Sequence, residues 1–307
     1  MSKSIKHLSL SIATGIALGF SWPVNGLTFL IFISLIPLLY LEELIRKDNL
    51  KFKSIRAFGY SYLSFLIWNL ITTWWLFNST LFGMLFANLC NSLFYALIFV
   101  AFYWAKSRLP FKSAYIFLIS AWIAFEKLHL FWDFSWSWLN LGNVFSEKIY
   151  WIQWYEYTGT FGGSLWILCI NVWIFYLLKN ENFKSLKNII RKLIPPLISI
   201  ALPIVFSLYL YQKVEIKDKT IEVLMMQPNI DPYKSKYKLT NENFLNQLFD
   251  QLKPYLTKNT KYVLTPETYF AEGYGEELLS FYKSKIHNDI QKKIADFPNT
   301  QIIGGIQ

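Results

Sequence analysis

Seven apolar stretches, each about as long as a membrane is thick, dominate the first two thirds of this sequence. A helix that crosses the hydrocarbon core of a bilayer needs roughly 17–25 mostly apolar residues. We place such stretches at 6–22, 24–41, 57–77, 80–104, 112–131, 162–178 and 194–212. The composition agrees, because 54% of the residues are hydrophobic and 19% are aromatic, more than a soluble domain of this length needs. The sequence therefore predicts a multi-span α-helical membrane domain over 1–212, with about seven transmembrane helices.

The first two apolar stretches are joined by a very short connection, Trp22-Pro23-Val24-Asn25-Gly26. They either cross the membrane as two spans with a tight turn or form a re-entrant hairpin, and the sequence leaves both open. No small-residue cleavage site follows the first stretch, and a second stretch comes at once. Removal of the first stretch as a signal peptide is therefore not expected.

The net charge of +10 is concentrated in the apolar part of the chain. Residues 1–212 hold 17 Lys and Arg against 8 Asp and Glu, whereas residues 213–307 hold 13 against 12. The basic residues alternate between connections, with 15 on one side of the predicted spans (1–6, 42–56, 106–112 and 179–192) and 2 on the other, Lys127 and Lys148. Cytoplasmic loops carry such an excess of Lys and Arg. We therefore expect a cytoplasmic N-terminus, 213–307 outside the cytoplasm after an odd number of crossings, and no nucleic-acid partner.

Polar and aromatic residues within the apolar part have two interpretations. The segment 126–160 is rich in Trp and Tyr, which is typical of an ordinary interfacial belt or of a platform on the outer leaflet where a lipid enters a site. Asn88, Asn91 and Asn171 lie inside predicted spans, where interhelical hydrogen bonds are expected more often than substrate binding. Cys90 and Cys169 also lie in apolar stretches without metal-like spacing, and we interpret them as small buried hydrophobic residues.

The pattern changes after residue 212 to that of a water-soluble α/β segment. Strands are predicted at 220–227, at 262–265 and from 300 onward, with helices at 240–253 and about 276–295 between them. Thr240 or Asn241 is expected to cap the first of these helices. Strand, helix, strand, helix, strand is typical of an α/β layered domain. Since the last predicted strand runs to residue 307, we expect partner strands to be missing and 213–307 to be an incomplete domain.

One carboxylate of this segment is a candidate for chemistry. Glu267 follows the second predicted strand directly after Pro266, and a carboxylate is commonly presented in this way at the end of a sheet. A Pro-Glu pair is a weak signal by itself. The three histidines are scattered, and no glycine-rich phosphate loop is present, so the sequence predicts no metal and no nucleotide site.

Taken in order, these motifs resemble the apolipoprotein N-acyltransferase family. The motifs are the Trp22-Pro23 turn, Trp138-Leu139-Asn140-Leu141-Gly142-Asn143, Gln227-Pro228-Asn229-Ile230, Thr265-Pro266-Glu267 and Ile303-Gly304-Gly305. The family consists of bacterial inner-membrane enzymes whose periplasmic domain resembles the nitrilase (carbon–nitrogen hydrolase) superfamily. The resemblance therefore implies a multi-pass protein of the bacterial inner membrane. Its soluble part would be an incomplete α/β nitrilase-like domain with α-β-β-α layers, corresponding with 1–212 to the first three-fifths of a family member.

The resemblance also implies an activity. Family members move an acyl chain from a phospholipid, through an enzyme thioester, to the N-terminal amine of the S-diacylglyceryl-cysteine of an apolipoprotein, without a cofactor. Their triad is a Glu, a Lys and a Cys, and the Glu corresponds to Glu267 as the general base. The Lys and the Cys nucleophile correspond to sequence after residue 307, so 1–307 alone is expected to be inactive. Tyr237 occupies roughly the place of an aromatic residue, usually Trp, that contacts substrate in the family.

Other functions stay open at this point. One is another membrane-anchored amidase or acyltransferase of the nitrilase type. Another is a non-catalytic protein, transporter-like or a scaffold, with a structural soluble tail. A Lys and a Cys at nitrilase positions downstream would favour an enzyme, whereas a true stop after residue 307 would favour a scaffold or one half of a split enzyme.

Overall fold

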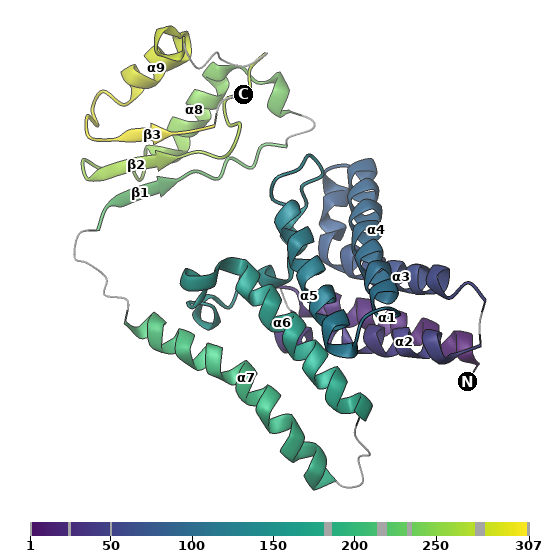
Figure 1. The fold of residues 1–307 in the computed structure, drawn as a ribbon. Helices are drawn as coiled ribbons and strands as arrows, with labels where there is room; N and C mark the ends of the chain where they lie inside the picture. The colour runs from purple at the N-terminus through teal and green to yellow at the C-terminus, as the bar shows by residue number, and fades with distance from the viewer. Residues whose placement is uncertain are drawn as a thin grey trace. The chain divides into compact units, whose positions relative to one another are not determined.

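The computed structural model describes residues 2–23, 26–49, 51–180, 186–213, 220–231, 235–273 and 280–305. The chain divides into two compact units, Met1–Val214 and Glu215–Gln307, which Figure 1 draws as a helical part and a small α/β part. The protein is mostly helical. Of the connection predicted between the first two spans, Val24 and Asn25 lie outside the described residues.

The described residues of unit 1 form seven α-helices and several 3-10 turns. The helices are α1 Lys3–Ser21, α2 Ile36–Lys47, α3 Lys53–Thr73, α4 Leu81–Ala105, α5 Phe111–Leu128, α6 Tyr155–Asn180 and α7 Leu186–Gln212. The 3-10 turns are η1 Thr28–Phe32, η2 Trp74–Asn78, η3 Ser137–Leu139, η4 Leu141–Phe145 and η5 Ile149–Trp151. Each predicted span overlaps one of these helices, although the bounds differ. In the described residues, four segments are both long and apolar enough to cross a membrane: Thr28–Lys47, Leu81–Ala105, Tyr155–Lys179 and Ile190–Gln212.

The number of such segments is therefore smaller than the seven expected. Helices α1, α3 and α5 are of 18 to 21 residues, but they are less apolar, and each carries charged residues. The four apolar helices, by length and composition, mark the chain as a membrane protein. Crossing by the three more polar helices depends on how they pack and on where their charges lie.

Two helices differ from the predicted spans for local reasons. The second stretch, expected as one helix over 24–41, is interrupted between η1 and α2. There Asn171 accepts a hydrogen bond from the Leu35 N–H (2.9 Å) and donates one to the Ile31 carbonyl (2.8 Å), which satisfies backbone groups that the break leaves free. Helix α6 begins earlier than expected, with a kink at Gly159, whose φ is +64°. This conformation favours glycine.

The other polar residues of the spans also bond between helices. Asn91 donates to the Asn69 side chain (2.8 Å), and Thr73 donates to Asn88 (3.0 Å). Together with Asn171, these contacts confirm the interpretation of the three asparagines as helix–helix hydrogen-bonding groups.

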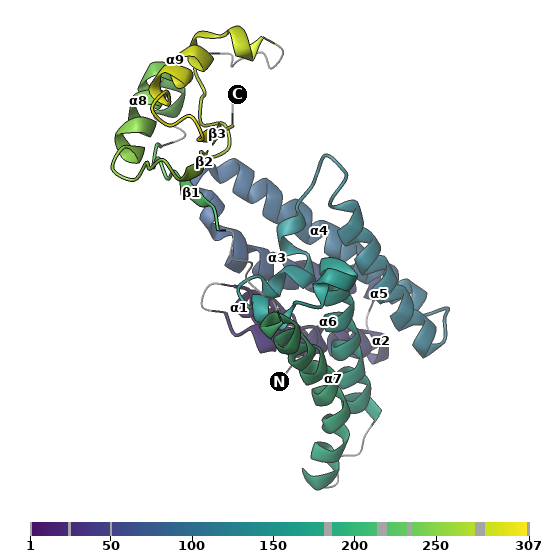
Figure 2. The same ribbon diagram turned by 90° about the vertical axis from the view of Figure 1, so that its left-hand side faces the viewer.

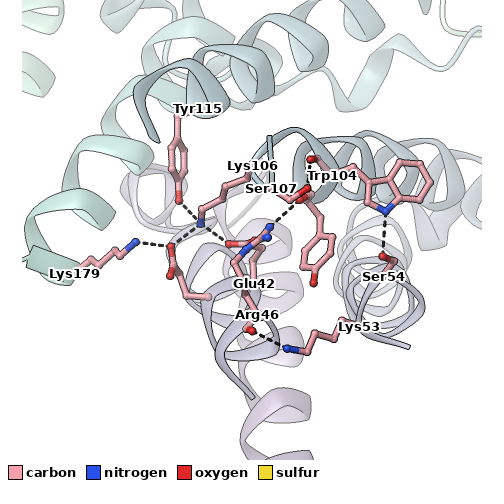
Figure 3. Close-up of polar contacts among 11 residues, drawn as sticks. Glu42, Arg46, Lys53, Ser54, Trp104, Lys106, Ser107, Tyr115 and Lys179 are labelled. Carbon is pink, nitrogen blue, oxygen red and sulfur yellow. Dashed lines mark hydrogen bonds and ion pairs between the residues drawn. The ribbon is translucent and has the colours of Figure 1, made fainter. Parts of the chain in front are cut away.

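A cluster of charged side chains joins the ends of several helices in unit 1 (Figure 3). Glu42 and Glu43, near the end of α2, are buried. Lys106, just after α4, contacts both carboxylates, and Lys179 at the end of α6 contacts Glu43 at 2.6 Å. Arg46 lies 2.6 Å from Glu42. Pairing with cations offsets the cost of burying these two carboxylates.

The described residues of unit 2 form a three-stranded parallel sheet with two helices on one face. Its elements are β1 Glu222–Met225, η6 Lys236–Lys238, α8 Asn241–Leu252, β2 Thr260–Leu264, η7 Phe281–Lys283, α9 Lys285–Lys293 and β3 Gln301–Ile303. The strand order is β1-β2-β3, with both pairs parallel. The order of strands and helices matches the sequence prediction. Helices α8 and α9 cover the same face (Figure 2), with Phe244, Leu248, Val263 and Ile290 in the core.

The helix bounds follow from their caps. The Thr240 side chain accepts from the Asn243 N–H, and the Asn243 side chain reaches back to the Thr240 N–H, a capping box that starts α8 as predicted. The second helix starts later than the expected residue 276, because Ser284 caps it by accepting from the His287 N–H. Of the segment expected to be helical, 276–279 lies outside the described residues.

Candidate functional site

A cavity of about 320 Å³ opens at the carboxyl ends of β1 and β2. In parallel sheets this edge is where ligands usually bind, because the loops that follow the strands gather there. The lining residues are Gln227, Pro228, Asn229, Ile230, Lys236, Phe244, Pro266, Glu267 and Tyr269. The structure therefore brings together two segments that the sequence singled out separately, 227–230 and Pro266-Glu267.

Glu267 is held at the mouth of this cavity by backbone contacts on either side. Ahead of it, the Thr265 N–H donates to the Ile303 carbonyl at 3.0 Å, which continues the pairing of β2 with β3. Behind it, Thr268 has a φ of +49°, a conformation that costs energy for a non-glycine residue and is concentrated at functional sites. Glu267 itself is exposed, so its carboxylate is accessible to a substrate.

The glycine pair after β3 lies directly against this loop. A Cβ on Gly305 would stand 2.3 Å from the Thr268 nitrogen and 3.0 Å from the Glu267 Cα. The Gly305 carbonyl accepts a hydrogen bond from the Phe270 N–H at 3.2 Å. Only a residue without a side chain allows this approach, which gives the Gly304-Gly305 motif a physical reason.

Lys236 is a site residue that the sequence did not identify. It lines the cavity, and its Nζ donates to the Thr268 Oγ1 at 2.6 Å. It therefore links the segment after β1 to the residue next to Glu267. The sequence held no signal for this, because a lysine in a connection with several lysines looks like an ordinary solvated residue.

Tyr237, the predicted substrate-contacting residue, lies beside this cavity residue but does not line the cavity itself. Its side chain is 57% exposed, and the Lys236 Nζ lies 5.7 Å from the centre of its ring. The predicted neighbours 232–234 lie outside the described residues. A role for Tyr237 stays a prediction.

Hydrogen bonds hold the buried part of the cavity lining in place. Tyr269 is 2% exposed, its hydroxyl donates to the Phe244 carbonyl at 2.8 Å, and burial raises the pKa of this hydroxyl. It therefore stays protonated and keeps its hydrogen bond at neutral pH. Gln247 of α8 donates to the Pro228 carbonyl at 3.0 Å. These contacts fix the two loops that present Glu267 and 227–230.

Two ionisable side chains that could take part in chemistry line this cavity, the carboxylate of Glu267 and the ammonium group of Lys236. A carboxylate that is open to substrate can act as a general base, and an ammonium can stabilise negative charge. Among the described residues, no group of three or more His, Cys, Asp and Glu is arranged to hold a metal ion. Neither Cys90 of α4 nor Cys169 of α6 lines the cavity, whose lining residues all belong to unit 2.

Two comparisons with known proteins bear on this geometry. Residues 14–173 match the model of the apolipoprotein N-acyltransferase N-terminal domain. An apolipoprotein N-acyltransferase of Chlorobaculum tepidum is 30% identical over 250 residues, which is 80% of this chain and 45% of the relative. The chain therefore spans about half the length of this relative. Since unit 1 ends at Val214, a match over 250 residues also includes part of unit 2.

Proposed function

This chain belongs to the apolipoprotein N-acyltransferase family, and from that premise we propose that it takes part in the N-acylation of lipoproteins. In the proposed reaction, a cysteine thiolate attacks an ester of a phospholipid and forms an enzyme thioester, with release of a lysophospholipid. The N-terminal amine of an S-diacylglyceryl-cysteine then attacks the thioester, and the acyl chain passes to the amine as an amide. The free thiol is regenerated.

The observation that supports this proposal most directly is the position of Glu267 at the cavity of unit 2, in a chain that belongs to this family. Its carboxylate stands at the mouth of the cavity at the ends of β1 and β2, where a general base can take the thiol proton and later a proton of the attacking amine. The resemblance assigns the cysteine and the lysine that stabilises the oxyanion to sequence after residue 307. We accordingly expect 1–307 alone to lack the nucleophile.

We extend the proposal to the fold of unit 2, as part of a nitrilase-like domain with α-β-β-α layers. One face of the sheet is covered by α8 and α9, but the other face is apolar and open. Its cross-strand rows are Val223, Tyr262 and Gln301, and Met225, Leu264 and Ile303. Met225 is 80% and Ile303 54% exposed. A second sheet packed on these rows would bury them, as sheets in a sandwich do.

The proposed topology has a cytoplasmic N-terminus and seven crossings, with 1–212 in the bacterial inner membrane and 213–307 in the periplasm. Ion pairs within unit 1 support it. Lys3 lies 2.8 Å from Asp48, which places the start of α1 beside the end of α2. The ion pairs of Glu42 and Glu43 with Lys106 and Lys179 bring the ends of α4 and α6 to the same end of α2. These four helix ends lie at one level, so α3 and α5 must run back across the bundle between them.

The proposed partners are a phospholipid as acyl donor, an apolipoprotein as acceptor and the surrounding membrane lipid. Tyr237 stays the proposed substrate-contacting residue, because an exposed ring next to Lys236 is available to a substrate that enters the cavity. No cofactor is required by this reaction.

The test of the proposal is Glu267→Gln in a protein that carries this chain together with the downstream sequence. General-base catalysis typically contributes roughly 10²–10⁴-fold, so we expect acyl transfer to a diacylated lipopeptide to fall by at least about a hundredfold. The melting temperature should stay unchanged, because the Glu267 side chain is exposed. Glu272→Gln, a neighbouring carboxylate that does not line the cavity, is the matched control. A Glu267→Gln protein that keeps more than about a tenth of the activity would contradict the role of general base.

A further inference from the structure

A second cavity, in unit 1, lies between α4 and the segment that follows α5. It has a volume of about 210 Å³. One face of α4 contributes Phe86, Cys90, Asn91 and Phe94, and residues 129–136 contribute the opposite wall. The proposed acyl transfer does not use this cavity. The cavity lies in a part of unit 1 that is rich in aromatic residues.

Three residues of its lining have buried polar atoms without a partner in the described part of the chain. They are the Asn91 Oδ1, the His129 Nε2 and the Trp136 Nε1. Asn91 is 2% exposed and His129 is 1% exposed. A buried polar group without a hydrogen bond is costly, so three of them around one cavity call for a physical explanation.

The hydrogen-bonding character of each atom can be assigned. The Asn91 amide nitrogen donates to the Asn69 Oδ1 at 2.8 Å, which leaves the Asn91 oxygen as an acceptor. The His129 Nδ1 accepts from the Trp136 backbone N–H at 3.0 Å, so the neutral ring carries its hydrogen on Nε2. The indole N–H of Trp136 is a donor. These three buried atoms thus offer two donors and one acceptor. Asp133 and Ser135, which are both exposed, also line the cavity.

Part of the exposed lining is aromatic. Phe86 and Phe134 are 45% and 54% exposed, and their ring centres are 6.3 Å apart. Phe94 also lines the cavity, with its ring centre 5.0 Å from that of Trp132. Aromatic rings with polar groups beneath them suit a molecule that has an apolar chain and a polar end.

We propose that this cavity binds the hydroxyl-bearing polar end of a membrane amphiphile, with its apolar chain along Phe86 and Phe134. A hydroxyl accepts hydrogen bonds from the two N–H groups and donates one to Asn91, whereas an ester or a phosphate can only accept and an ammonium can only donate. The site is separate from the cavity with Glu267, and the proposal does not depend on acyl transfer.

The native thiol of Cys90 lines the cavity and reports its occupancy. In a Cys169→Ser background it is the single cysteine. The probes are monooleoylglycerol, which bears two hydroxyls, and methyl oleate, which has the same chain and none. The protein, full chain, is kept in a detergent without hydroxyl groups. We expect monooleoylglycerol at about nine times its Kd to slow alkylation of Cys90 by N-ethylmaleimide about tenfold and to raise the melting temperature, and methyl oleate to do neither.

Two matched substitutions locate the effect. Trp136→Phe removes one of the two buried donors of the cavity. Trp154→Phe removes another buried indole N–H without a described partner, outside the cavity. Loss of one hydrogen bond should weaken binding of monooleoylglycerol about fivefold in Trp136→Phe, and binding to Trp154→Phe should equal that of the parent. Three outcomes would overturn the proposal. Both lipids could have equal effects, neither lipid could change the alkylation rate or the melting temperature, or the two Phe variants could bind monooleoylglycerol equally well. The cavity would then hold water only.

Discussion

At the scale of single residues, the Glu267 carboxylate is presented just after β2 ends at Leu264, next to Thr268 with its positive φ. The position of Glu267 could be predicted from the sequence because its signal is local. A strand, a proline and a carboxylate follow one another, and the strand end predicts where the side chain goes. Lys236 could not be found, because its place depends on a contact with Thr268 that is 32 positions away. The backbone conformations that shape the site, such as the φ of +49° at Thr268, likewise depend on what packs against them.

Gly305→Ala tests how closely the carboxylate must be placed. The added Cβ would stand 2.3 Å from the Thr268 nitrogen, which is backbone and cannot rotate away. We expect the Glu267 loop to shift and acyl transfer by the protein with its downstream sequence to fall at least about tenfold, since small displacements of catalytic groups cost up to about a hundredfold. Gly59→Ala is the control, because nothing lies within 4 Å of its added Cβ. Equal activity of the two variants would show that the glycine pair does not position Glu267.

At the scale of elements, the helices and strands of unit 2 followed from periodicity, and the capping box made the start of α8 predictable. The interruption before α2 was not predictable, because it depends on Asn171, 136 positions from Leu35. The segment 137–151 was likewise expected only as an aromatic stretch. It forms three 3-10 turns, and a carboxylate of α5 holds the start of the second turn.

That carboxylate belongs to Glu126, which is fully buried. Its Oε1 accepts from the Leu141 N–H at 2.7 Å and from the Trp122 Nε1 at 3.1 Å. Glu126→Leu would leave both donors without an acceptor, at a cost of about 1–3 kcal/mol each. Glu126→Gln keeps an acceptor oxygen. We therefore expect the Leu variant to unfold at a clearly lower temperature than the Gln variant in thermal melts of the detergent-solubilised protein. Equal melting temperatures would mean that Glu126 does not hold the turns in place.

At the scale of the whole molecule, hydropathy alone and charge lead to different topologies. If only the four most apolar segments crossed, the basic connections 46–56 and 106–112 would face opposite sides of the membrane. The N-terminus and unit 2 would then share one side. With α1, α3 and α5 also crossing, the basic connections face one side, and unit 2 faces the other. The buried contacts of Lys106 with Glu42 and Glu43 agree with the second arrangement, because they join the ends of α2 and α4.

The number of crossings can be decided with single cysteines. Cys90 and Cys169 are replaced by Ser, and a cysteine is placed either at Lys51, between α2 and α3, or at Lys253, just after α8; both positions are exposed. In cells with a permeable outer membrane and an intact inner membrane, a membrane-impermeant maleimide should label Lys253→Cys and leave Lys51→Cys unlabelled until detergent is added.

Seven crossings put positions 51 and 253 on opposite sides of the membrane. Four crossings, with α1, α3 and α5 not spanning, also put 51 and 253 on opposite sides. They differ from seven crossings because they separate 51 from the N-terminus, so a third cysteine at Ser2 is needed. We expect Ser2→Cys to behave like Lys51→Cys, because Lys3 pairs with Asp48. Labelling of both Ser2→Cys and Lys253→Cys while the inner membrane is intact would establish an even number of crossings. That result would refute the seven-span arrangement.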